Sequence, residues 1–355
     1  MNKASSAGSA VNKDADSLLR LGLPINCKEV RALQKELEEA KGNAQKALWS
    51  KAQSNARNAK SLLASKRTQI LAAVAPANKA AAEPLLDKAV QYADALEAAA
   101  GEAKLDRTLE AQANAVGAVG EVEELMVGAF PYTVPSEYAG LPRLYGRAKV
   151  RVELKRGPKS EESKFDLDDE LKDKIAVTLL LDGYNAPITA GNFLDLVKKG
   201  FYNGMEIQRS DGFVVQTGDP RGIDQEKPDN PVGYVEDGKI RKVPLEVFPA
   251  GAKSPVYGAT FDEEGYGGAA STLPFNAYGA LGMAREEYDA DSASSQWFWL
   301  LFDSDLTPAG KNLLDGRYAC FGYTIEGADY LRAVKVGDVI TSAKVISGEE
   351  FLKYN

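Results

Sequence analysis

The spacing of apolar residues changes once along this chain, near residue 130, and the change predicts two structural classes in one polypeptide. Before it, apolar residues recur three or four positions apart, as Val30, Leu33 and Leu37 do, which is the period of a helix with one buried face. After it, short runs of Val, Leu, Ile and Phe alternate with Gly, Pro, Asp and Asn, as in strands joined by turns. Because 355 residues exceed the usual size of one domain, we expect a helical domain followed by a β domain.

The first region, residues 1–130, is predicted to be an α-helical bundle. It is rich in Ala, Leu, Lys, Glu and Gln, which favour helices, and short connections favour antiparallel neighbours. Proline and glycine residues divide it into a short helix and three longer ones, at about 14–21, 27–74, 81–100 and 103–127.

Charge is distributed unevenly within this bundle. Residues 42–75 carry six bases and no acid, whereas residues 79–130 carry four bases and ten acids. We expect these helices to balance each other's charge. A basic face that docks on an anionic membrane or partner is the alternative.

The second region is predicted to be a closed antiparallel eight-stranded β-barrel with capping helices. Residues 131–147 contain several prolines and are interpreted as a linker, so the barrel would occupy residues 148–355. Eight short apolar runs separated by turn residues supply the strands. The stretch 187–200 has the spacing of a helix and would cover one end of the barrel.

Residue counts exclude several kinds of chemistry. The chain has no histidine and two cysteines, Cys27 and Cys320. Ser-His-Asp hydrolases, Cys-His proteases and His-ligated zinc enzymes are therefore excluded, and we expect neither metal nor cofactor. No stretch approaches the ~18 apolar residues of a membrane span. The net charge of −8 argues against a nucleic-acid partner.

Five ordered segments in the second region carry a resemblance to a known family. The first contains Gln208-Arg209 and Asp211-Gly212-Phe213-Val214-Val215-Gln216, after Gly200-Phe201-Tyr202-Asn203-Gly204. The others are residues 253–258, 282–284, 295–298 and 314–322. In this order they resemble the cyclophilins over residues 145–350, which implies a cyclophilin-like barrel and peptidyl-prolyl cis-trans isomerase activity.

The whole chain also resembles one branch of that family. Phe130-Pro131-Tyr132, residues 181–187 and Ala284-Arg285-Glu286-Glu287 resemble the large thylakoid-lumen cyclophilins of plants and algae, which place a helical domain before the barrel. The resemblance implies a location in the chloroplast thylakoid lumen and a role in assembly and maintenance of photosystem II. A contact between bundle and barrel is expected, and peripheral membrane association is left open.

The resemblance assigns the groove residues. Rotation about an X–Pro bond has a barrier of ~18–20 kcal/mol, and an enzyme lowers it by holding the twisted amide better than either planar form. The implied catalytic residues are Arg209, which would donate to the prolyl side of the amide, Phe213 and Gln216. The implied substrate-binding residues are Ala284, Arg285, Gln296, Phe298, Leu313, Leu314 and Tyr318.

Departures from the family pattern affect the expected activity. One residue is missing between Arg209 and Gly212, Leu313 stands where the groove tryptophan is usual, and Tyr318 stands where the groove histidine is usual. Insertions at 221–250, 262–275 and 303–312 are expected to be solvated loops, with a lid over the groove as the alternative.

The resemblance and these departures leave two functions open. One is a docking protein for proline-containing segments of photosystem II proteins with weak or absent isomerase activity, regulated by the helical domain. The other is an active isomerase that serves as a general lumenal folding catalyst.

Overall fold

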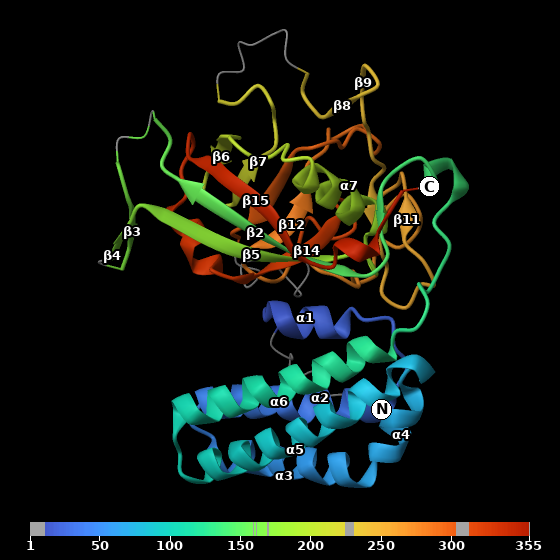
Figure 1. Cartoon of the computed structure of the whole chain (residues 1–355), viewed down its shortest axis with the longest axis vertical. Coiled ribbons are helices and arrows are strands. Elements are labelled where there is room, and N and C mark those ends of the chain that lie inside the picture. The colour runs from blue at the N-terminus through green and yellow to red at the C-terminus, as the bar shows by residue number, and fades with distance from the viewer. Residues whose placement is uncertain are drawn as a thin grey trace, which may run out of the picture. The chain divides into compact units, whose positions relative to one another are not determined.

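The computed structural model describes residues 11–158, 160, 162–168, 170–223, 231–302 and 312–354. It contains two compact units (Figure 1). One is the helical unit Leu23–Pro131, and the other joins the described residues before Leu23 to the chain from Tyr132 onward. Parts of the predicted insertions, residues 224–230 and 303–311, lie outside the described residues.

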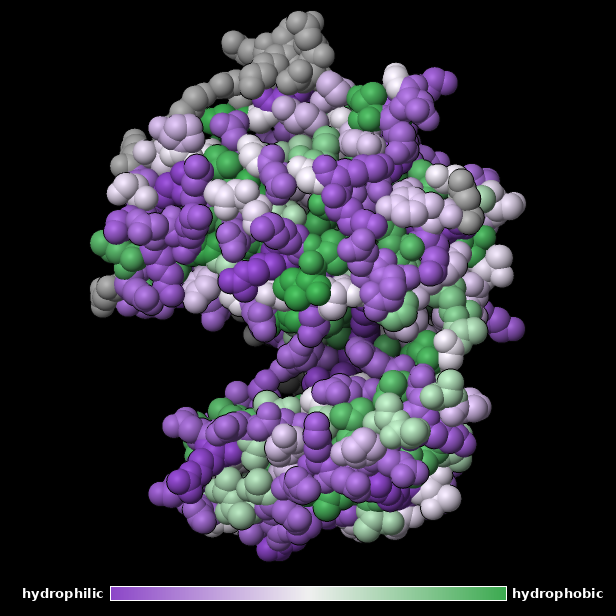
Figure 2. All heavy atoms as spheres, in the orientation of Figure 1, coloured by the Kyte–Doolittle hydropathy of each residue, from purple (hydrophilic) through white to green (hydrophobic). Residues whose placement is uncertain are grey.

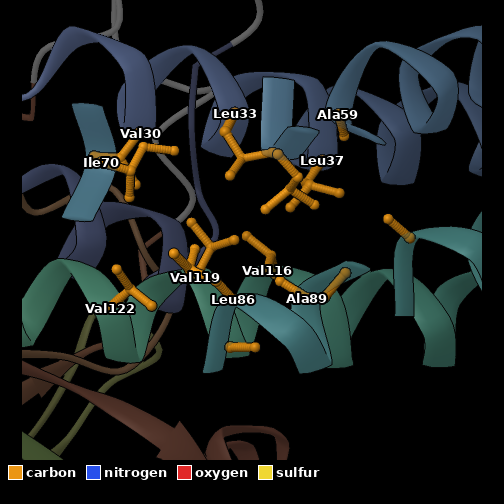
Figure 3. Packing of buried hydrophobic residues seen from close by; sticks show 14 of the residues in the cluster. Val30, Leu33, Leu37, Ala59, Ile70, Leu86, Ala89, Val116, Val119 and Val122 are labelled. Carbon is orange, nitrogen blue, oxygen red and sulfur yellow. The ribbon is translucent and has the colours of Figure 1, made fainter. Parts of the chain in front are cut away.

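The helical unit consists of five α-helices within the described ranges. They are α2 (Lys28–Gln45), α3 (Trp49–Ser65), α4 (Arg67–Ala73), α5 (Lys79–Gly101) and α6 (Leu105–Met126). Their apolar faces meet in one core, in which the side chains of Val30, Leu33, Leu37, Leu86 and Val119 are fully buried (Figure 3). The predicted bundle is thus confirmed, with a core that follows the helical spacing of the sequence.

The single helix predicted over residues 27–74 is wrong, because the chain turns back within it. A straight helix of that length would extend about 70 Å. The chain instead turns at Lys46–Leu48, where Ala47 has a left-handed φ of 54°, so that Ala52, Ala56 and Ala59 of α3 become buried. No proline marks this turn in the sequence, which is why the apolar spacing alone did not predict it.

Charge balance between α3 and α5 is confirmed. Arg57 and Lys60 of α3 contact Glu97 of α5 at 2.7 and 2.9 Å, and Lys60 also contacts Asp94 at 2.6 Å. Arg67, at the start of α4, contacts Asp87 at 2.8 Å. Three of the six bases in residues 42–75, namely Arg57, Lys60 and Arg67, are therefore paired with acids of α5.

The second unit is built on one eight-stranded antiparallel sheet. Its order is β15-β2-β5-β14-β12-β13-β7-β6. The bounds are β2 (Arg147–Lys155), β5 (Lys174–Asp182), β6 (Ile207–Ser210), β7 (Val214–Thr217), β12 (Ala280–Met283), β13 (Trp297–Leu300), β14 (Cys320–Glu326) and β15 (Val339–Ser347). Backbone hydrogen bonds between the two edges, among them Ile207 N to Asp338 O at 2.8 Å and Ile340 N to Met205 O at 2.8 Å, close the sheet on itself.

Four two-stranded ladders accompany this sheet. They are β1 (Arg143–Leu144) with β16 (Leu352–Lys353), β3 (Phe165–Leu167) with β4 (Glu170–Lys172), β8 (Val235–Glu236) with β9 (Lys239–Ile240), and β10 (Glu246–Val247) with β11 (Val256–Tyr257). The segment predicted as a linker therefore ends in a strand that pairs with the C-terminal end of the chain.

Helix α7 (Pro187–Lys198) fills one end of the barrel, as predicted for residues 187–200. Phe193 packs on Tyr202 and Trp297, with ring centroids 5.1 and 4.9 Å apart. The N-terminus of α7 receives its cap from a distant strand: Glu246 of β10 accepts hydrogen bonds from the backbone N–H groups of Ile188 and Thr189 at 3.2 and 2.9 Å.

Helix α1 (Ala15–Leu21) belongs to the barrel unit and not to the helical bundle that the sequence predicts for residues 1–130. Leu18 and Leu19 are buried against an apolar cluster that contains Phe275 and Tyr323. Arg147 Nη2 donates to Leu19 O at 2.5 Å, and Asn185 Nδ2 donates to Gly22 O at 3.0 Å. The helical spacing predicted the buried face correctly, but it carries no information about which unit covers that face.

Figure 2 shows one face of the surface, on which hydrophilic residues predominate and hydrophobic residues occur in small patches. None of the helices in the described ranges combines the length and the apolar composition of a membrane span. The thiols of Cys27 and Cys320 are free and buried.

Candidate functional site

A cavity of about 400 Å³ opens beside strands β6, β7, β13 and β12. Nine of the ten residues predicted from the sequence line it: Arg209, Phe213, Gln216, Ala284, Arg285, Phe298, Leu313, Leu314 and Tyr318. The tenth, Gln296, does not line the cavity but is hydrogen-bonded to Gln216, which does. The fold thus brings together residues that are up to 109 positions apart in the chain, as Arg209 and Tyr318 are.

Four further residues line the cavity and were not predicted: Val214, Leu300, Phe302 and Asn312. Leu300 and Phe302 follow Phe298 at intervals of two, so the alternation of side chains along a strand could have found them. Asn312 carried no such signal. Its backbone N–H and side chain are held by Asp315 and by Phe275 O, contacts that depend on the path of the loop.

The floor of the cavity is the ring of Phe298. This residue lies opposite Gly282 in the pairing of β13 with β12, and only 5% of it is exposed. A Cβ atom at position 282 would lie 2.1 Å from Phe298 Cζ, so the ring occupies space that only glycine leaves free. Phe275 stacks beside the ring at 6.0 Å, and Tyr318 meets it edge-on at 6.1 Å.

Large apolar side chains form an exposed rim around this floor. Phe213 is 56% exposed and stacks on Phe302 with ring centroids 5.3 Å apart, and Leu313 is 74% exposed. Exposed apolar side chains that gather around a concave surface are typical of a binding site.

The guanidinium of Arg209 is held by a carboxylate within the hairpin that carries it. Arg209 Nε and Nη2 each lie 2.6 Å from Asp211 Oδ2. The other oxygen, Asp211 Oδ1, accepts from the backbone N–H groups of Phe213 and Val214 at 3.0 and 3.1 Å. The turn between β6 and β7 is short, with Gly212 at a φ of 83°, and it places Asp211 directly beside the arginine.

The same contacts keep Asp211 ionised. Partial burial alone would raise the pKa of this carboxyl, but the N–H groups of Val214 and Phe213 and the charge of Arg209 outweigh burial and hold its pKa below the ordinary value. Two donors of the guanidinium that face Asp211 are therefore already engaged. A peptide that used the same donors would have to displace the carboxylate.

Gln216 is oriented by a series of hydrogen bonds that runs away from the cavity. Its Nε2 donates to Gln296 Oε1 at 3.1 Å, and Gln296 Nε2 donates to Asp219 Oδ2 at 3.3 Å. Asp219 is buried and paired with Arg221 at 2.7 Å. Because Gln296 occupies one N–H group of Gln216, the carboxamide oxygen of Gln216 stays available to a ligand.

Arg285 borders the cavity on the side of β12. Its Nε donates to Arg317 O at 2.9 Å, and its guanidinium carbon lies 5.0 Å from the ring centre of Tyr318. Among the residues that the structure describes, no cluster of His, Cys, Asp or Glu is placed to hold a metal ion. The polar side chains that line the cavity include two guanidinium groups, those of Arg209 and Arg285, and two carboxamides, those of Gln216 and Asn312.

Comparison with known proteins agrees with this geometry. Residues 167–349 match the model of the cyclophilin type peptidyl-prolyl cis-trans isomerases, and residues 14–127 match the PsbQ-like domain of CYP38-like peptidyl-prolyl cis-trans isomerases.

Two relatives match nearly the whole chain. The chloroplastic peptidyl-prolyl cis-trans isomerase CYP38 of Arabidopsis thaliana is 44% identical, over 96% of this chain and 75% of that protein. A thylakoid lumen peptidyl-prolyl cis-trans isomerase of Synechocystis is 38% identical, over 97% of this chain and 85% of that protein. The chloroplastic CYP37 of Arabidopsis is 33% identical over 66% of this chain and 47% of its own length.

A closed eight-stranded sheet with an arginine, a glutamine and a phenylalanine floor around one cavity is the arrangement of a cyclophilin, and the chain belongs to the cyclophilin-type peptidyl-prolyl cis-trans isomerases. More narrowly, its helical unit places it among the large cyclophilins that carry a PsbQ-like domain before the barrel.

Proposed function

We propose that this protein binds proline-containing segments of lumen-facing photosystem II proteins in the chloroplast thylakoid lumen, and that it assists their assembly and maintenance while isomerising prolyl bonds weakly. The lumenal location is supported by the names of its relatives in Arabidopsis and Synechocystis, which specify the chloroplast and the thylakoid lumen. Binding is supported by the apolar cavity with Phe298 at its floor and Phe213 and Leu313 at its rim.

The observation that carries the weak activity is the pairing of Arg209 with Asp211. Isomerisation needs a donor that stabilises the twisted amide more than the planar one. Charge-assisted hydrogen bonds are about twice as strong as neutral ones, so a carboxylate is a strong competitor for a guanidinium. The apolar floor can still seat a proline while Asp211 holds Arg209, which separates binding from catalysis.

Replacing Asp211 by asparagine is expected to raise kcat/KM for an Ala-Pro peptide by about three- to tenfold, since an exposed ion pair of about 1 kcal/mol no longer competes for the guanidinium. The asparagine oxygen can still accept from the N–H groups of Phe213 and Val214, so the turn is retained. A chymotrypsin-coupled assay of the full chain measures the effect.

Asp262→Asn is the matched control, because Asp262 pairs with Arg317 and does not line the cavity. Its rate should equal that of the wild type. Arg209→Ala should remove the gain when added to Asp211→Asn. An unchanged or lower rate in Asp211→Asn would show that this carboxylate does not restrain the arginine.

Docking itself is tested by calorimetric titration of the full chain with synthetic lumen-facing loops of photosystem II subunits, each with its proline retained or changed to alanine. We expect measurable affinity for at least one loop and its loss when the proline is changed. A wild-type turnover as high as that of a single-domain cyclophilin assayed in parallel would favour the alternative, a general lumenal folding catalyst.

A further inference from the structure

Arg285 stands at the boundary of two hollows. It lines the cavity of about 400 Å³ that contains Phe298, and it also lines an adjoining hollow of about 300 Å³. The two hollows share Gln216, Ala284 and Arg285. An extended segment seated on Phe298 that continued toward the second hollow would therefore pass this side chain.

Neutral groups hold the Arg285 guanidinium in place. Its Nε donates to Arg317 O, and its Nη1 donates to the backbone oxygens of Glu286 and Glu287 at 2.8 and 3.0 Å. The ring of Tyr318 lies beneath it. Carbonyl groups and an aromatic ring fix the direction of a guanidinium without forming an ion pair with it. Glu263 is near enough to interact with its charge, since hydrogen bonds from Thr260 and, to a smaller extent, the charge of Arg285 hold the pKa of Glu263 below its ordinary value. Nη2 makes no hydrogen bond to any described residue.

The neighbouring cations differ from Arg285 in this respect, since each is paired with a carboxylate. The pairs are Arg209 with Asp211, Arg221 with Asp219, Lys242 with Asp289 and Arg317 with Asp262. Within the described ranges, no carboxylate lies within 4.0 Å of Arg285, and the lining of the larger cavity contains none. Glu286 is the acid that lines the adjoining hollow, and its backbone oxygen, as described above, accepts from Arg285.

We infer that Arg285 binds an acidic side chain of the bound segment, so that this cyclophilin prefers proline-containing segments with a glutamate or aspartate nearby. The inference rests on the proposed docking of proline-containing segments. A guanidinium without a carboxylate partner, held rigid and offering free donors, is suited to bind a carboxylate.

The pairing of β12 with β13 indicates how far from the proline the acidic residue of the bound segment should lie. Phe298 lies on β13 and Arg285 follows the end of β12, the neighbouring strand. Phe298 pairs with Gly282, and Arg285 is three residues beyond Gly282, an offset of about 10 Å at the ~3.3 Å per residue of an extended chain. The acidic residue is therefore expected two or three positions from the proline.

The test uses alanine-based peptides with one central proline, in which glutamate or glutamine occupies position −3, −2, +2 or +3. Each peptide is titrated calorimetrically against the full chain as wild type, Arg285→Gln, Arg285→Lys and Arg317→Gln. Arg317→Gln is the matched control, because it removes a nearby positive charge that already has a partner.

In the wild type, glutamate at one or more positions should bind about three- to fivefold tighter than glutamine at low salt, and the difference should shrink at high salt. The preference should vanish in Arg285→Gln, persist in part in Arg285→Lys and persist fully in Arg317→Gln. Because the readout is a preference between two peptides, loss of loop structure alone would not mimic it.

Equal affinity for glutamate and glutamine at every position would overturn the inference while leaving proline docking intact. A glutamate preference that survived Arg285→Gln would overturn it as well. If no proline peptide bound while the protein remained folded, the proposed docking function would fall, and this inference with it.

Discussion

Gly282→Ala is expected to weaken the binding of proline peptides at least tenfold and to lower the free energy of unfolding by about 2–3 kcal/mol, the upper part of the range of costs for overfilling a packed site. The added methyl group would lie 2.1, 2.5 and 2.7 Å from ring atoms of Phe298. Strand β12 is bonded to β13 on one side and β14 on the other, so the backbone cannot move away. The ring must leave the floor and enter the cavity where the proline would sit.

Two variants separate this steric effect from a general effect of replacing glycine. Gly117→Ala in α6 meets no atom within 4 Å, and it should leave binding unchanged while it stabilises the helix by up to about 1 kcal/mol. Phe298→Leu combined with Gly282→Ala should recover part of the stability lost in Gly282→Ala. Calorimetric titration and urea unfolding measure both quantities. Peptide affinity within twofold of the wild type in Gly282→Ala would show that Phe298 is not the floor of the binding site.

The second large effect is a dependence of stability on pH that comes from Glu246. This carboxyl is 1% exposed, and burial raises its pKa to about 7 despite hydrogen bonds from the N–H groups of Thr189 and Ile188. No cation lies within 4.0 Å of it in the described part of the chain. Because the folded state keeps a proton that the unfolded state releases, the stabilisation is full below about pH 4.5 and is lost as the pH rises through about 7.

The free energy of unfolding should therefore fall by on the order of 3 kcal/mol between pH 5 and pH 8 from this group alone. Glu246→Gln should remove that part of the slope, since glutamine cannot ionise, and Glu264→Gln, a change of an exposed carboxyl, should retain it. Urea unfolding at several pH values measures the difference between each variant and the wild type. Identical slopes in the wild type and Glu246→Gln would contradict the assignment.

The sequence allowed the cavity to be predicted because its residues belong to short segments with fixed internal spacing. Phe213 and Gln216 are three positions apart, and the strand that carries Phe298 follows in the same order as in the family. Strand alternation then decides which side chains share a face. The roles of these residues remain proposals, but their location in one cavity follows from strand order and alternation.

What the sequence did not predict depends on contacts between distant or flexible groups. The pairing of Arg209 with Asp211 depends on the turn at Gly212, and the cap that Glu246 provides to α7 joins residues 57 positions apart. Strands β1 and β16 have two residues each, too few to show an alternating pattern. Each of these features depends on how the chain is arranged in space, which the spacing of residue types in a single sequence does not indicate.

Because α1 packs with the barrel, the helical unit Leu23–Pro131 is bordered in the chain by segments of the barrel unit on both sides. The chain leaves the barrel unit at Gly22, whose oxygen is held by Asn185, and returns at Tyr132, whose hydroxyl donates to Tyr184 O at 2.9 Å. The two points at which the chain leaves and rejoins the barrel unit are therefore hydrogen-bonded to consecutive residues, Tyr184 and Asn185. A truncation that removes every residue before the linker would also remove Leu18 and Leu19 and expose the apolar cluster that they cover. Excision of residues 23–131 alone, with a short glycine-serine bridge in their place, would preserve that packing and yield a self-contained cyclophilin module.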